Sequence, residues 1–228
     1  MSIPNYDTAK YVWQWFRANT DITKIGVAAL MGNMRAESSF IPNNMQDAYE
    51  TARGYTDATY TSIVDSGTYR WKNFTTCVDS FAHDEVGYGL CQWTFYSRKS
   101  RLYEFAKADG VSIGNLQMQC KFAWDELQKE YVYVLNKIRN ATDLRAASDV
   151  ILKQFENPQI QTEPVQIERA GYGQEIYEAF HDLEDTPAVV ADAAGSAEVE
   201  YCSDDDTPTE AEIRRVFLWA YKKHGGQI

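Results

Sequence analysis

The chain has 228 residues, of which 44% are hydrophobic and 24% charged, and this suffices for one or two globular domains with a sizeable core. The ordinary share of charged residues excludes disorder throughout the chain. No apolar run approaches the roughly 18–20 residues of a membrane span, and residues 1–7 lack the basic and apolar regions of a secretory signal peptide.

The net charge of −11 comes from one C-terminal stretch. Residues 182–212 contain eleven acidic residues and no Lys or Arg, so the rest of the chain has equal numbers of acidic and basic residues. A neutral body argues against nucleic acid as a partner, because phosphate binding needs a basic surface.

The cysteines and histidines lack the spacing of a metal site. No two cysteines form a CxxC pair and the three histidines are scattered, so zinc-ligand patterns are absent. We therefore expect no metal and no cofactor. Four cysteines in a chain of this length are also too few for a disulfide scaffold, and we expect mostly buried thiols. They are Cys77, Cys91, Cys120 and Cys202.

Two helices are predicted at the start of the chain. The first covers residues 7–18, with Asp7 as its N-cap. The second covers residues 22–36, and its small residues permit close packing against a neighbour. It ends near Glu37, and Pro42 prevents its continuation. The apolar face of the first helix consists of Tyr11, Val12, Trp15 and Phe16.

Residues 41–80 have a different composition, rich in Thr, Tyr, Gly and Asp. Two segments with β-forming residues, 59–64 and 68–71, are separated by the turn-forming sequence Asp-Ser-Gly. This pattern predicts a small β-hairpin region with long loops.

The helical pattern returns after this region. Asn115 is the predicted N-cap of the second of these helices, and the Asn157-Pro158 pair ends the third. The predicted helices cover residues 98–109, 115–139, 143–155 and 164–181.

We predict a main domain at residues 1–181, followed by two further segments. Residues 182–207 have no periodic apolar face and are predicted to be an acidic linker. Thr207 then caps a short helix, and we assign residues 208–228 to this C-terminal segment. Such a short helix is marginal alone, so we expect it to dock on the main domain or on a partner.

One candidate for chemistry is Glu37, at the end of the second predicted helix. At the junction with a polar region, a carboxyl group is expected to be half-buried against apolar side chains. Desolvation would raise its pKa toward the working pH, as a general acid requires. The alternative is an ordinary solvated glutamate in the last turn of a helix.

A second candidate is the segment 87–94, which reads Gly-Tyr-Gly-Leu-Cys-Gln-Trp-Thr. The amide of Gln92 offers a hydrogen-bond donor and an acceptor, and Tyr88, Trp93 and Tyr96 offer flat aromatic faces. These groups suit a sugar ring. The alternative is a turn with Trp93 in the core.

Together the two segments resemble the lysozyme-like superfamily, and most closely the phage tail lysozyme family. The resemblance covers roughly residues 8–181. It implies a mainly helical α+β fold of the lysozyme type, with a small β lobe between helices, and Glu37 as the catalytic acid. The matching residues are Gly32, Asn33, Glu37 and Ser38; Gly87, Gly89, Leu90, Gln92 and Trp93; and the later Phe155-Glu156-Asn157-Pro158 and Arg169-Ala170.

The resemblance also suggests a second carboxylate shortly before Gly87. Asp84 lies three residues before it, and Glu85 and Asp79 are competitors. In glycoside hydrolysis the two carboxyl groups stand ~6.5–9.5 Å apart in an inverting enzyme and ~5–5.5 Å apart in a retaining one. The sequence does not provide this distance.

The leading functional interpretation is a muramidase that cleaves the β-1,4 bond between N-acetylmuramic acid and N-acetylglucosamine in peptidoglycan. Glu37 would protonate the leaving oxygen and Asp84 would activate water or stabilise positive charge. Tyr88, Gln92, Trp93 and Tyr96 would line the cleft.

The alternatives are a lytic transglycosylase, which needs only Glu37, a glucosaminidase, and a non-catalytic virion or wall-binding component. We expect the host cytoplasm before release to the cell wall, or the virion tail, as the location. Glycan strands of peptidoglycan are the expected partner, and the C-terminal helix offers a contact with the virion or a second copy.

Overall fold

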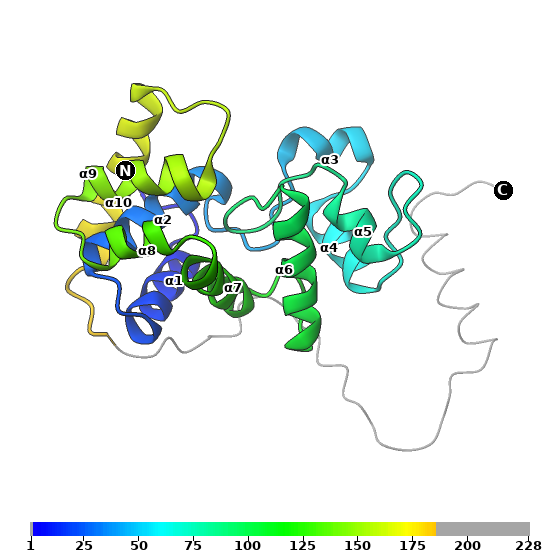
Figure 1. Cartoon of the computed structure of the whole chain (residues 1–228), viewed down its shortest axis with the longest axis horizontal. Coiled ribbons are helices and arrows are strands. Elements are labelled where there is room, and N and C mark those ends of the chain that lie inside the picture. Colours follow the sequence, from blue (N-terminus) through cyan, green and yellow to red (C-terminus); the bar gives the residue numbers. More distant parts are fainter. Residues whose placement is uncertain (1, 186–228) are drawn as a thin grey trace, which may run out of the picture. The chain divides into compact units, whose positions relative to one another are not determined.

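Helices form most of residues 2–185, the part of the chain that the computed structural model describes (Figure 1). These residues belong to one compact unit, Met1–Val190. Most of the predicted linker, the C-terminal helix and Cys202 lie outside the described residues.

The centre of the fold is α2 (Lys24–Ser38), whose residues are mostly buried. It packs against α1 (Tyr6–Asn19) and most extensively against α10 (Glu163–Phe180). Gly32 explains the close approach to α10, because a Cβ atom there would lie 2.6 Å from the carbonyl oxygen of Arg169. Asp7 lies in the first turn of α1, and Asn5 occupies the N-cap that was predicted for Asp7.

The expected β lobe is not seen, since residues 2–185 contain isolated β-bridges but no strand. The segment predicted as a hairpin instead contains α4 (Asp57–Asp65). Thr56 and Thr59 form a capping box that starts this helix, and Tyr60 and Val64 are buried on one face. The hairpin prediction was wrong because it followed β-branched composition and missed this helical start signal and i, i+4 spacing. The neighbouring elements are α3 (Asp47–Arg53), α5 (Cys77–Ala82) and α6 (Tyr96–Ala108).

The long helix predicted over 115–139 is divided into two. Asn115 caps the first, α7 (Leu116–Lys129), by accepting a hydrogen bond from the Met118 N–H, as predicted. The chain then leaves helical geometry and enters α8 (Val132–Arg139).

The third predicted helix ends in an unusual turn. It begins as α9 (Leu144–Ile151) and continues as η1 (Leu152–Glu156), a π-helical turn. Asn157 then adopts a left-handed conformation with φ of 48°, which ends the helix just before Pro158. A π-helical turn is rare and often marks a functional site.

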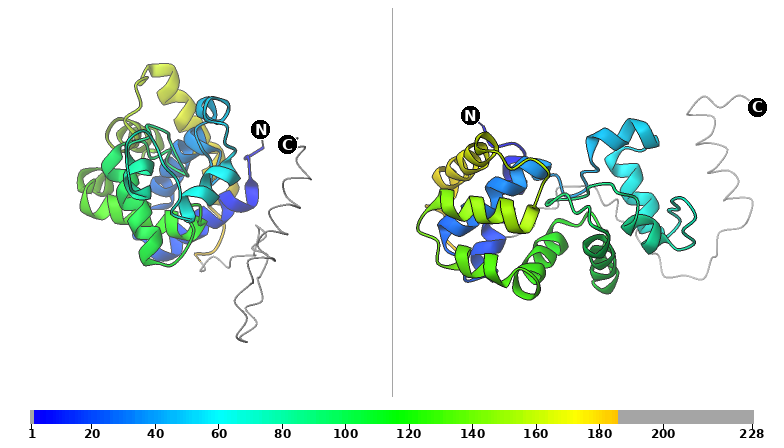
Figure 2. Two further views of the ribbon diagram at one scale, coloured as in Figure 1. Left: turned by 90° about the vertical axis from the view of Figure 1, so that its right-hand side faces the viewer. Right: turned by 45° about the horizontal axis from the view of Figure 1, so that its top comes forward.

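The helices gather in two groups. α1, α2 and α7–α10 lie together, α3, α4 and α5 lie apart from them, and α6 runs between the two groups (Figures 1 and 2). Contacts of α6 with both α5 and α7 link the groups. None of the helices in the described residues is long and apolar enough to cross a membrane. The three cysteines described, Cys77, Cys91 and Cys120, are buried free thiols, as expected.

Candidate active site

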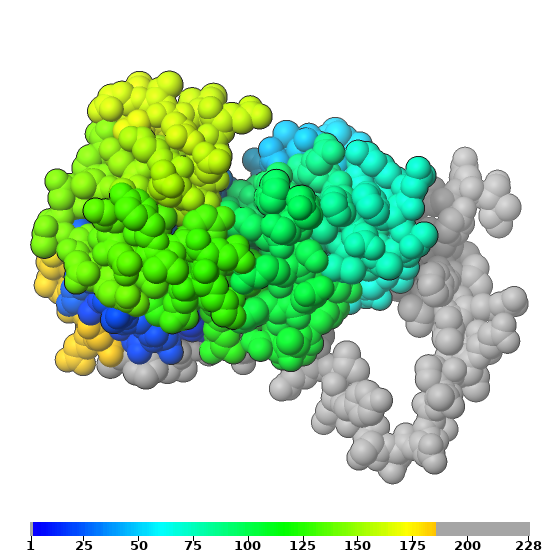
Figure 3. Space-filling model, in the orientation of Figure 1, coloured from blue at the N-terminus to red at the C-terminus, as the bar shows by residue number. Residues whose placement is uncertain are grey.

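A cavity of about 1160 Å³ lies where segments from both groups of helices meet. The end of α2 contributes Glu37, and α3 with the residue before it contributes Gln46 and Tyr49. Residues 82–98 and 154–159 supply most of the remaining lining. Figure 3 shows the surface hollowed between the yellow-green segment that includes η1 and the blue segment around α3.

Glu37 lies at the wall of this cavity, in the last turn of α2. Ser39 and Phe40 both adopt left-handed conformations, with φ of 51° and 65°, and turn the chain sharply after the helix. The Glu37 side chain is 17% exposed, and its Oε1 lies 2.5 Å from Nη2 of Arg169. The predicted half-buried position is therefore observed, and a cation accompanies the carboxylate.

Arg169 is itself held in place by Asn33, which belongs to the same sequence motif as Glu37. Its Nη1 donates to Oδ1 of Asn33 at 3.3 Å. The amide nitrogen of Asn33 donates to the Ala29 carbonyl at 3.0 Å and to Oγ of Ser148 at 3.2 Å. Asn33 thus connects α2, α9 and α10 behind the cavity, and orients the guanidinium that faces Glu37.

Two of the four predicted sugar-contacting residues, Gln92 and Tyr96, line the cavity. Gln92 adopts a positive φ of 42°, and its amide nitrogen donates to Oδ1 of Asn44 at 2.6 Å. Tyr96 stacks on His83 with ring centroids 5.1 Å apart. The adjacent Phe95, which also lines the cavity, is 61% exposed. These residues give the cavity an aromatic wall and one amide.

The other two, Tyr88 and Trp93, are fully buried and do not line the cavity. The hydroxyl of Tyr88 shares a 2.6 Å hydrogen bond with the hydroxyl of Thr61. The indole N–H of Trp93 donates to Oε2 of Glu126 at 2.7 Å, and the same carboxylate accepts two hydrogen bonds from Arg98. Of the two interpretations of Trp93, the structure shows a place in the core and not at the cavity.

Asp84 is placed away from the cavity lining and is fully buried. Its carboxylate pairs with the ammonium group of buried Lys99 and accepts hydrogen bonds from the hydroxyls of Tyr60 and Tyr69. The Val86 N–H also donates to it, at 3.0 Å. With its oxygens occupied in this way and no access to the cavity, Asp84 is unsuited to activating a water molecule.

Glu85 and Asp79, the other two candidates for the second carboxylate, also lack the half-buried position at the cavity that a catalytic carboxylate needs. Glu85 lines the cavity, but its side chain is 72% exposed and lies 3.5 Å from Nζ of Lys72. Asp79 lies in the first turn of α5, where its side chain accepts a hydrogen bond from the Thr76 hydroxyl at 2.5 Å.

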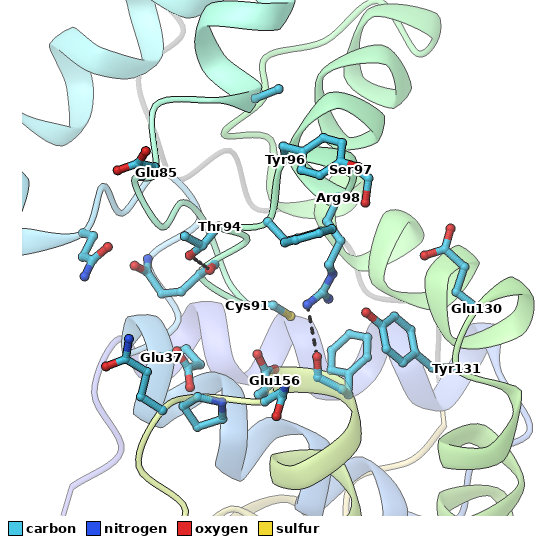
Figure 4. A pocket seen from close by; sticks show the side chains of 18 of the residues that line it. Glu37, Glu85, Cys91, Thr94, Tyr96, Ser97, Arg98, Glu130, Tyr131 and Glu156 are labelled. Atoms are coloured by element: carbon cyan, nitrogen blue, oxygen red, sulfur yellow. Dashed lines mark hydrogen bonds between the residues drawn. The ribbon is translucent and has the colours of Figure 1, made fainter.

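The structure brings a different carboxyl group, Glu156, to the cavity. It lies at the end of η1, on the same side as Glu37 (Figure 4). Its Oε1 is buried and has no hydrogen-bond partner. Burial raises the pKa of Glu156 well above its ordinary value, and the nearby charge of Glu37 raises it further. Sequence reasoning matched Glu156 only as part of a motif, and assigned no chemistry to it.

Comparison with known proteins identifies the family of the chain. The profile of the phage tail lysozyme family matches residues 7–180, which include every residue of the cavity. The chain belongs to the phage tail lysozyme family. Membership indicates a lytic enzyme that acts on peptidoglycan. No curated protein matches the chain.

Among residues 2–185 of this family member, no group of three or more His, Cys, Asp or Glu side chains is placed to hold a metal ion.

Proposed function

We propose that the protein is a muramidase, which hydrolyses the β-1,4 bond between N-acetylmuramic acid and N-acetylglucosamine in glycan strands. The observation that carries this proposal is the position of Glu37, a partly buried carboxyl group at a helix end that opens on a cavity with aromatic and amide lining. Family membership supplies the substrate class. We further propose the virion tail, or the host cell before lysis, as the place where the enzyme is found.

In this mechanism Glu37 delivers the proton to the leaving glycosidic oxygen. The Glu37 side chain is only 17% exposed, so the protein shields most of it from water during the proton transfer. Once the proton has left, the guanidinium of Arg169 stabilises the resulting carboxylate at 2.5 Å. Asn33 fixes the direction of that guanidinium through its own hydrogen bond.

The sugar rings would bind along the aromatic wall. Tyr96, supported from behind by its stack on His83, presents a flat face for a pyranose ring. Exposed Phe95 extends this face, and the amide of Gln92 offers hydrogen bonds to hydroxyl or acetamido groups. Tyr88 and Trp93 support the wall from the core and have no direct contact with substrate in this proposal.

One observation favours a lytic transglycosylase as the second candidate. Of the carboxylates proposed from sequence for the second catalytic role, Asp84 is committed to its buried pair with Lys99. A transglycosylase needs only the acid Glu37, because the 6-hydroxyl of the substrate attacks and an anhydro product forms. The ends of the released products distinguish the two reactions.

The proposal is tested by Glu37→Gln, which keeps the size of the side chain and removes its proton. We expect this variant to fold and to lose turbidity-clearing activity on purified cell walls by about 100-fold or more, the range that general acids contribute. Glu85→Gln makes the same change at an exposed carboxylate of the same cavity and should retain activity. Clearing by folded Glu37→Gln within a few-fold of the wild type would refute the role of Glu37.

A further inference from the structure

The environment of Glu156 is unusual for a carboxyl group. The π-helical turn η1 carries it to the cavity wall, where one oxygen is buried without a hydrogen-bond partner. An unpartnered buried polar atom is costly and needs an explanation. Cys91, which lines the same cavity, is buried and offers no strong hydrogen bond to a carboxylate.

The charges that surround Glu156 come from three directions, and each is already engaged. Glu37, on α2, is paired with Arg169 on α10. Arg98, on α6, donates to Glu126 on α7 at 2.7 and 2.8 Å and to the carbonyl of Phe155 at 3.1 Å. Neither guanidinium therefore forms an ion pair with Glu156, although the charge of each lowers the pKa of Glu156, against the effect of burial.

From this arrangement we infer that Glu156 and Glu37 hold one proton between them, and that Glu156 keeps Glu37 supplied with it during catalysis. This role rests on the proposed function, because it presupposes that Glu37 is the general acid. Glu156 would then be a positioning residue that acts through the proton of Glu37. Two carboxyl groups in one partly buried site cannot both ionise without repulsion, so a shared proton is the stable state.

The resting place of the proton follows from the two environments. Oε1 of Glu37 and Oε1 of Glu156 are both buried without a hydrogen bond, but Glu37 has the guanidinium of Arg169 beside it and Glu156 has no ion-pair partner within residues 2–185. Burial, followed by the charge of Glu37, raises the pKa of Glu156 well above its ordinary value. In this proposal the shared proton therefore rests on Glu156. The site then contains one neutral and one ionised carboxyl group, and the proton must reach Glu37 before Glu37 can protonate the leaving oxygen.

The reaction step balances as follows. The O–H bond of Glu156 breaks and its proton passes to the Glu37 carboxylate, and Glu37 gives its proton to the glycosidic oxygen as the C–O bond breaks. Both carboxylates are then ionised beside the positive charge that develops on the sugar. Water adds its hydroxide to the anomeric carbon, and its remaining proton restores the neutral member of the pair.

The test uses Glu156→Gln, which is neutral and similar in size but carries no transferable proton. We expect kcat/KM on purified peptidoglycan to fall by at least about tenfold at pH 7. We also expect the alkaline limb of the pH profile to move by one pH unit or more toward acid, because Glu37 must then retain its proton beside Arg169 unaided. Glu156→Asp should restore part of the rate and of the profile. Glu104→Gln, a change at an exposed carboxylate outside the cavity, should match the wild type.

A second substrate separates proton supply from a structural role. The second substrate is the peptidoglycan disaccharide joined through a β-glycosidic bond to dinitrophenolate. This leaving group needs little protonation, so Glu156→Gln should cleave the substrate nearly as fast as the wild type. An equal loss of rate on both substrates, or a pH profile identical to that of the wild type, would overturn the inference.

A measurement that does not depend on turnover completes the test. In a ¹³C NMR titration of the wild-type glutamate carboxyls, one should titrate well above the ordinary range, and this signal should be absent from Glu156→Gln. If the wild-type protein shows this late-titrating carboxyl but does not cleave cell walls, the proposed function fails and proton sharing stands. If no carboxyl in the folded wild type titrates late, proton sharing fails whatever the activity.

Discussion

Asp84→Asn should unfold this protein more readily without removing a catalytic group. Asp84 and Lys99 are both fully buried, and the carboxylate also receives hydrogen bonds from Tyr60, Tyr69 and the Val86 N–H. The amide of Asn retains some of these hydrogen bonds but leaves the ammonium group of Lys99 without its counter-charge. An uncompensated buried charge is the main cost of such a substitution.

The expected magnitude follows from this change. Breaking a buried ion pair by removing one partner typically destabilises a protein by about 3–5 kcal/mol. For a chain of this size, that loss lowers the melting temperature by roughly 6–20 °C. Burial lowers the pKa of Lys99 to about 8, against the opposing effect of Asp84, so loss of Asp84 favours the neutral amine and moderates the cost.

Urea denaturation followed by circular dichroism gives the free energy of unfolding, and turbidity clearing at a temperature where the variant is folded gives the activity. The double variant Asp84→Asn with Lys99→Met should be more stable than the sum of the single variants predicts, by about 1–3 kcal/mol, because no buried charge remains. An unchanged melting temperature together with lost activity in Asp84→Asn would refute this reasoning and restore Asp84 as a catalytic candidate.

Two further predictions concern packing and alkaline stability. Gly32→Ala should destabilise the protein by about 1–3 kcal/mol in thermal melts, because its Cβ would lie 2.6 Å from backbone atoms of α10. Gly171→Ala, where nothing lies within 4 Å, should be neutral or stabilising by up to about 1 kcal/mol, and equal effects at both sites would contradict the packing argument. Burial raises the pKa of Tyr11 to about 12, so its contribution to stability is complete below pH 10, the unfolded value, and is lost as the pH rises through 12. Denaturation between pH 9 and 12 should show this loss, up to about 1.4 kcal/mol per pH unit for each such tyrosine, whereas phenolate absorbance that titrates fully near pH 10 in the folded protein would contradict it. Burial acts in the same direction on Tyr60, Tyr69 and Tyr88.

Local sequence signals predicted the helix that presents Glu37, because the signals lie within one segment. The small residues of α2 and Pro42 act over a few positions, and the structure has the helix end at Ser38. Asn115 and Asn157 marked helix boundaries for the same reason. The residues around α4 were misread, since their β-branched composition favours strands while the capping box at Thr56 and tertiary packing favour a helix.

The partners of the cavity residues were beyond local reasoning, because they come from distant parts of the chain. Asp84 resembles a catalytic acid by position, and only the fold reveals that Lys99 and two tyrosines surround it. Glu156 has no distinctive local pattern for chemistry, and its proposed role depends on a buried oxygen without a partner and on the nearby charge of Glu37. Access to the cavity separates Glu37 and Glu156 from Asp84, and this access depends on the fold.

Mass spectrometry of the fragments released by the wild-type protein from purified peptidoglycan tests the central claim most directly. The account predicts fragments with reducing N-acetylmuramic acid ends, which a muramidase produces. Anhydro-muramic ends would show a lytic transglycosylase, reducing N-acetylglucosamine ends would show a glucosaminidase, and release of no fragments by the folded protein would show a non-catalytic component; each of these results would contradict the account.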